Sequence, residues 1–234
     1  MSQPFCIYNH MKNLIKPLAA GAVLLLAAAS PNAAIIITAQ NGVTGTFGVS
    51  NTDLGQTAGT TLTLDSGSAA FGSSVGKLND GDVYGLGADD ETVATLTPTD
   101  GSVATYHFDL TASPLGYNLT SIASLTGSTQ GRSQQVYDVE YSLVGAGFTP
   151  LASVLGTLTD NGSVGETQVT LSNLSLLNVS AIRFTFHNGV GGESMFREID
   201  AFGTAAVPEP SSLLTAGMMA AGGVAAVLLR RKRA

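Results

Sequence analysis

The 234-residue chain has a formal net charge of −7 at pH 7, no tryptophan and a single cysteine. An acidic chain repels the phosphate backbone of nucleic acids, so DNA and RNA are not expected partners. The one cysteine, Cys6, lies near the N-terminus and has no partner for an intrachain disulfide, so the rest of the chain must fold on an apolar core.

The N-terminus has the layout of a secretory signal peptide. Lys12 and Lys16 form a positive region, residues 18–29 are uncharged and apolar, and small residues follow up to Ala34. This layout predicts a signal-peptide helix within residues 1–34, with cleavage near Ala34. Met11 offers an alternative start that leaves a signal peptide of more ordinary length. The other interpretation is a retained N-terminal anchor, for which the apolar stretch is short.

Residues 35–206 form the predicted exported domain, in which 16 acidic residues stand against 4 basic ones for a formal charge of −12. Short runs of alternating apolar and polar residues predict β-strands joined by turns. The expected strands cover residues 60–64, 103–110, 135–143, 167–171, 181–187 and 196–202, and the expected turn dipeptides are Asn41-Gly42, Asp80-Gly81, Asp100-Gly101, Asn161-Gly162 and Asn188-Gly189. This pattern predicts one all-β domain, an antiparallel β-sandwich or jelly roll.

Five segments of this domain, taken in their order along the chain, resemble the segments of a known fold. They are residues 77–82 (KLNDGD), 106–110 (YHFDL), 137–142 (YDVEYS), 181–186 (AIRFTF) and 196–203 (FREIDAFG). Together they resemble the discoidin and galactose-binding-like jelly roll. The resemblance implies that fold and leaves the function open, because unrelated activities occur on it.

The same resemblance implies a calcium site. In several galactose-binding-like lectins, an Asp-Gly-Asp loop, a carbonyl before it and a glutamate on the closing strand hold a structural calcium ion. The matching side chains are Asp80, Asp82 and Glu198, and the matching carbonyls are those of Lys77 and Arg197. Calcium prefers oxygen ligands of this kind. The alternative is an ordinary polar turn, with Glu198 solvated or paired to Arg197.

A carbohydrate is the ligand that this fold suggests. The candidate ligand residues are Arg132, within Gly-Arg-Ser, and His187, at the end of a predicted strand. His107 lies inside a predicted strand and is expected to be structural. The domain shows no nucleophile elbow, zinc-binding helix motif or phosphate loop, so it is predicted not to be an enzyme. The alternative is a secreted glycan-active hydrolase that works through a pair of carboxylates.

The last 28 residues contain a predicted membrane span. Val207, Pro208, Glu209 and Pro210 precede an uncharged run at residues 211–229, and the basic residues Arg230, Arg231, Lys232 and Arg233 follow it. As a helix, that run extends about 28 Å, enough to cross the hydrocarbon core of a bilayer. The basic cluster predicts a cytoplasmic C-terminus and an exported domain on the other side.

Pro-Glu-Pro, a short apolar span and a terminal Arg-rich cluster resemble the PEP-CTERM sorting signal of bacterial exported proteins. The resemblance implies recognition by an exosortase, a membrane-embedded cysteine protease, in a Gram-negative bacterium that makes exopolysaccharide. The sequence therefore predicts that residues 207–234 are a sorting and anchor segment. The protein is expected to be anchored transiently and then to reside in the cell envelope or extracellular matrix, with a binding or structural role. The alternative is a simple C-terminal anchor that is never cut.

Overall fold

The computed structural model describes residues 34–208, except residues 44, 71–72, 82–95, 129–131, 157–164 and 190–191. The predicted signal peptide and the predicted span at 211–229 lie outside these residues. Among the helices of the described part, none has the length and apolar character needed to cross a membrane.

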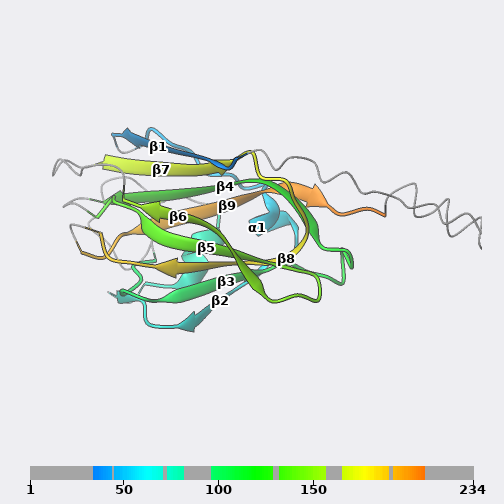
Figure 1. The fold of residues 1–234 in the computed structure, drawn as a ribbon. Helices are drawn as coiled ribbons and strands as arrows, with labels where there is room; N and C mark the ends of the chain where they lie inside the picture. The colour runs from blue at the N-terminus through cyan, green and yellow to red at the C-terminus, as the bar shows by residue number, and fades with distance from the viewer. Residues whose placement is uncertain are drawn as a thin grey trace, which may run out of the picture. The chain divides into compact units, whose positions relative to one another are not determined.

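The described domain is built almost entirely from β-strands (Figure 1). Two short helical segments, α1 (Leu54–Thr57) and η2 (Val75–Asn79), interrupt the succession of strands. The strands are β1 (Ile36–Gly42), β2 (Thr61–Ser66), β3 (Val103–His107), β4 (Tyr117–Ser128), β5 (Val136–Leu143), β6 (Phe148–Leu155), β7 (Gly165–Ser172), β8 (Leu176–Phe186) and β9 (Phe196–Ala205).

The strands form two antiparallel layers. One layer has the order β1-β7-β4-β9, and the other has the order β6-β5-β8-β3-β2. The layers join at one corner, where the start of β4 pairs with the start of β8 through Tyr117↔Val179 and Leu119↔Leu176. This arrangement confirms the predicted antiparallel β-sandwich.

Aromatic side chains fill the centre of the space between the layers. Phe184 on β8 meets the rings of Tyr106 and Tyr137 edge-on, with centroid distances of 5.8 and 5.7 Å. The buried hydroxyls are satisfied: Tyr106 donates to the Leu78 carbonyl at 2.6 Å, and the Tyr137 hydroxyl lies 2.8 Å from Ser124 Oγ. These bonds offset the cost of burying a polar group in an apolar core.

The six predicted strands are confirmed as β2, β3, β5, β7, β8 and β9, with shifted ends. The sequence interpretation missed β1, β4 and β6. It was also wrong about Asn41-Gly42, which forms the end of β1 and not a turn. Gly81 and Gly101 have positive φ angles of 72° and 76°, as expected for the glycine of a tight turn. The predicted turn at residues 161–162 lies outside the described part.

Candidate functional site

Four acidic side chains gather beside β9: Asp53, Asp80, Glu198 and Asp200, which we call the carboxylate cluster. Glu198 and Asp200 are two residues apart on β9, so their side chains point to the same face of the sheet. They are only 1% and 5% exposed. Such deep burial keeps both carboxylates away from any dissolved substrate, which argues against a hydrolase that uses this pair.

Asp53 connects α1 to β9. Its Oδ2 accepts a hydrogen bond from Gly55 N at 2.9 Å, which caps the start of α1. The same oxygen accepts from Ala201 N on β9 at 2.6 Å. One buried carboxylate therefore fixes the short helix against the edge of the last strand.

The two carboxylates of β9 hold further segments by hydrogen bonds. Asp200 accepts from Ser50 N at 3.1 Å. Glu198 accepts from Gly81 N at 3.3 Å and from Gln56 Nε2 at 2.9 Å. The segments before β2 and after η2 are thereby fastened over β9.

Burial makes Glu198 and Asp200 weaker acids than ordinary carboxyls. Burial, together with the charges of Asp200 and Asp80, raises the pKa of Glu198 to about 8. Burial also raises the pKa of Asp200 to about 7, with the charge of Asp53 adding to the effect. In slightly acidic solution both groups are therefore protonated, and they ionise as the pH rises through neutrality.

Two of the predicted calcium ligands lie close together. Gly81, which follows Asp80, donates its backbone N–H to Glu198. Asp80 also forms an ion pair with Lys77, whose Nζ lies 3.0 Å from Oδ2. Asp82 lies outside the described residues, so the complete ligand set remains a prediction.

The donor chemistry beside Glu198 fits a hard cation. Asp53 Oδ1 and Gln56 Oε1 are buried oxygens without a hydrogen-bond partner, and oxygen is the ligand that calcium prefers. Arg197 directs its Nε to the Gly127 carbonyl at 3.1 Å. Within the described residues, however, no group of three or more histidine, cysteine, aspartate or glutamate side chains is arranged to hold a metal ion.

The sequence interpretation missed Asp53 and Asp200 as members of this cluster, and Gln56 as the hydrogen-bond partner of Glu198. A usable sign was present for Asp200, because it alternates with Glu198 on an otherwise mostly apolar strand. Asp53 gave no comparable sign. Only the folded chain brings it to Ala201, 148 residues later.

A second polar group, the rim site, lies where β5 and β8 meet the loops at one end of the sandwich. It comprises His187, Asp138, Asp100 and Ser153. His187 Nε2 lies 3.1 Å from Asp138 Oδ2, and His187 Nδ1 lies 3.7 Å from Asp100 Oδ1. Ser153 Oγ donates to Asp138 Oδ1 at 2.5 Å. All four side chains are at least partly exposed, so a dissolved ligand can reach them.

The hydrogen bonds of the rim site keep Asp138 ionised. The bond from Ser153 and then the bond to His187 lower the pKa of Asp138 below its ordinary value. The rim site thus presents the hydrogen-bonded Asp138 carboxylate of β5 beside the imidazole of His187, directly after β8, and the Asp100 carboxylate of the turn before β3.

The predicted ligand residues Arg132 and His187 lie on adjoining loops. The Arg132 carbonyl accepts from Met195 N at 2.9 Å, and Ser194 Oγ donates to the Gln134 carbonyl. His187 N donates to the Val136 carbonyl at 2.9 Å. The β4–β5 and β8–β9 loops therefore meet at the end of the sandwich that carries the rim site.

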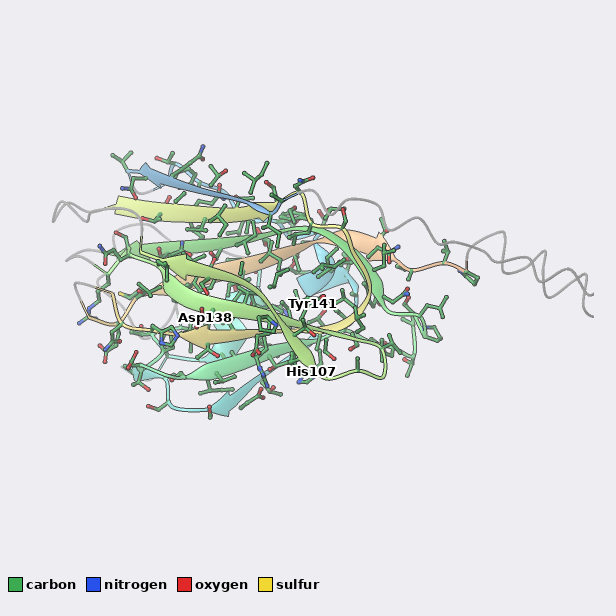
Figure 2. The ribbon with its side chains drawn as sticks, in the orientation of Figure 1. His107, Asp138 and Tyr141 are labelled. Atoms are coloured by element: carbon green, nitrogen blue, oxygen red, sulfur yellow. The ribbon has the colours of Figure 1, made fainter. Side chains whose placement is uncertain are left out.

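His107 lies away from this group, as Figure 2 shows for its position relative to Asp138. It is the last residue of β3 and is exposed on the outer face of its layer. Its Nε2 lies 3.4 Å from Thr63 Oγ1. His107 is therefore a natural comparison residue for His187.

No family model matches the chain, and no curated protein matches it. Solved structures with a similar chain path do exist. A CBM32 module, CpGH89CBM32-6 from Clostridium perfringens, is 16% identical over 64% of this chain and 98% of its own, with a TM-score of 0.42.

Two further structures show the same level of similarity. The family 32 module of C. perfringens NanJ, solved in complex with galactose, is 16% identical over 64% of this chain and 96% of its own, with a TM-score of 0.38. An F5/8 type C domain from Bacteroides fragilis is 14% identical over 63% and 93%, with a TM-score of 0.43. At these scores the similarity assigns the chain to no family, and galactose binding is a property of the NanJ module.

Proposed function

We propose that this chain is an exported, exosortase-processed protein whose non-catalytic β-sandwich binds carbohydrate at the rim site. The observation that carries the proposal is the position of His187 between Asp138 and Asp100. Sugar hydroxyls both donate and accept hydrogen bonds, so fixed carboxylates and an imidazole suit them. Groups already held by neighbours lose little freedom when a ligand binds.

The charge of the domain narrows the class of carbohydrate. Acidic residues outnumber basic ones by 16 to 4 between residues 35 and 206. An anionic polysaccharide would be repelled by this excess. The proposed ligand is therefore a neutral polysaccharide of the envelope or matrix, such as a neutral exopolysaccharide.

Saturable binding tests this proposal. The full chain, held in detergent micelles, would be titrated with a neutral exopolysaccharide from its host and with an anionic one of similar length. We expect a saturable signal with the neutral polymer and a much weaker one with the anionic polymer. No saturable binding to either polymer would favour a purely structural matrix protein.

The proposed sorting step agrees with the way the described chain ends. Ala206 N still donates to the Gly116 carbonyl at 2.9 Å, and Val207 is exposed. The Pro-Glu-Pro motif therefore begins within two residues of the last backbone bond to the fold. The intact mass of the protein from cells with and without the exosortase tests this step: trimming near residues 208–210 only when the enzyme is present supports it, and an uncut tail in both strains contradicts it.

The proposal includes a structural calcium ion at the carboxylate cluster. Asp80, Asp82 and Glu198 would supply carboxylate oxygens, and Lys77 and Arg197 would supply carbonyls. The ion would neutralise buried negative charge there.

A further inference from the structure

Several exposed apolar side chains lie at one end of the sandwich. The described part of the chain exposes nine large apolar side chains, and five of them lie on the loops and strand ends around the exit of β9. These five are between 38% and 75% exposed: Leu115, Leu143, Val144, Leu177 and Val207. We call this surface the apolar end.

Backbone hydrogen bonds bring these loops together. Ala206 N donates to the Gly116 carbonyl at 2.9 Å, which places the exit of β9 beside Leu115. Val144 N donates to the Asn178 carbonyl at 2.9 Å, which places the β5–β6 loop beside the start of β8. Figure 1 shows β9 leaving the sandwich at the end where these loops gather, on the right of the view.

The loops of the apolar end carry no charge. Residues 110–116, 143–148, 173–178 and 203–208 contain no Asp, Glu, Lys or Arg, although acidic residues predominate in the domain as a whole. Two acidic residues directly adjoin these segments in the sequence, Asp109 and Glu209. The Asp109 carboxylate accepts from Thr111 N at 2.7 Å and from Thr111 Oγ1 at 2.6 Å.

The apolar end is also the end to which the predicted membrane span is tied. Ala206 makes the last backbone hydrogen bond to the domain that the structure describes, and the predicted span begins at Ser211. Five residues of fully extended chain reach at most about 18 Å. While the tail is uncut, the apolar end is therefore held within this distance of the bilayer.

We propose that the apolar end rests on the outer surface of the membrane that holds the tail. This inference depends on the membrane tail of the proposed function. Exposed apolar patches mark interaction surfaces, and apolar side chains gain free energy by entering the interfacial region of a bilayer. The absence of charge on the four loops avoids the desolvation cost that Asp or Glu would bring.

Docking at the apolar end turns the rim site away from the membrane. β8 begins at Leu176, beside the apolar end, and its last residue, Phe186, precedes His187. Ten steps along a strand span about 33 Å. The rim site would therefore face the surrounding matrix while the protein waits to be cut.

Tryptophan fluorescence tests the inference directly, because the chain contains no tryptophan of its own. The full chain carrying Leu177→Trp would be reconstituted into phosphatidylcholine vesicles with and without brominated acyl chains. Leu155→Trp is the matched control, because Leu155 is 77% exposed at the end of β6, where it pairs with Val136 beside the rim site. Leu115→Trp provides a second probe at the apolar end.

The expected result is a blue-shifted emission and loss of most of the intensity in brominated vesicles for Leu177→Trp and Leu115→Trp. Leu155→Trp should show neither change. Resistance to carbonate extraction reports separately whether the tail is inserted. Inserted chains with unquenched probes at residues 115 and 177 would overturn the docking and leave the anchored tail standing. Chains extracted by carbonate would overturn both the anchored tail and the docking.

Discussion

The imidazole of His187 lies between two carboxylates, with Nε2 3.1 Å from Asp138 Oδ2 and Nδ1 3.7 Å from Asp100 Oδ1. Asp138 comes from β5, Asp100 from the turn before β3, and His187 directly follows β8. Three separate parts of the chain thus meet at one end of the sandwich. Fixed polar groups of this kind suit recognition better than they suit stability, because exposed ion pairs contribute little to folding.

Asp138→Asn should weaken carbohydrate binding and leave the folding stability almost unchanged. The substitution removes the charge that pairs with His187, but both groups are partly solvated. Asp65→Asn is the matched control, because Asp65 accepts similar bonds from Thr63 and Thr105 on the outer face of the same layer. Thermal unfolding and a titration with neutral exopolysaccharide would be compared for the two variants. Equal binding by both would count against the rim site.

In the presence of a chelator, the stability of the full chain should fall as the pH rises from about 5 to about 7. Glu198 and Asp200 have pKa values of about 8 and about 7 in the folded protein, above their ordinary values. Over this interval the folded state holds protons that the unfolded state has released, so raising the pH favours unfolding. Each group that stays protonated only in the folded state contributes about 1.4 kcal/mol per pH unit, so the expected loss for the two is about 2 kcal/mol per pH unit.

Urea unfolding at pH 5, 6 and 7 measures this slope. Glu198→Gln, which cannot ionise, should reduce the slope by about half, because Asp200 still titrates. A stability that rises over the same interval would show that the two carboxyls are ionised in the folded state at lower pH than we infer.

Calcium should raise the midpoint of thermal unfolding at pH 7.5. An ion that binds only the folded state adds about 2.7 kcal/mol at a hundred times its Kd. Glu198→Gln should abolish most of the shift. Glu140→Gln is the control, because Glu140 pairs with Arg183 at 2.6 Å outside the carboxylate cluster. A calcium shift of equal size in both variants would place the ion elsewhere.

Gly203→Ala should destabilise the domain by about 1–3 kcal/mol, as expected for overpacking. A Cβ at this position would lie 2.1 Å from the Asn118 carbonyl oxygen on β4. Gly147→Ala is the control, since a Cβ there would meet no atom within 4 Å. Chemical unfolding of both variants measures the difference. Equal stabilities would contradict the pairing of β4 with β9.

Strands with clear alternation of apolar and polar residues could be predicted from the sequence, and β8 and β9 are examples. β4 could not, although it is the longest strand, because Ser, Thr and Ala make up much of it and give a weak alternation. β6 contains Pro150, and proline disfavours the interior of a sheet, yet β6 lies at the edge of its layer, where proline is tolerated.

The candidate sites likewise contain some residues that the sequence predicted and others that it did not. Glu198 was predicted as a calcium ligand from the resemblance to galactose-binding-like domains, and His187 was predicted as a ligand residue from its place at a strand end. Their partners Gln56 and Asp138 are brought to them by tertiary folding over 142 and 49 residues of sequence, respectively. Such long-range neighbours leave no trace in local spacing.

The affinity of the full chain for neutral exopolysaccharide, measured for the parent, His187→Ala and His107→Ala, tests the central claim most directly. Hydrogen bonds to charged groups are worth about 1.5–3 kcal/mol, so losing one at the rim site should weaken binding about tenfold or more. His107→Ala should bind like the parent, because His107 lies on another part of the sheet. Parent-like binding by His187→Ala, or an equal loss in both variants, would contradict carbohydrate binding at the rim site.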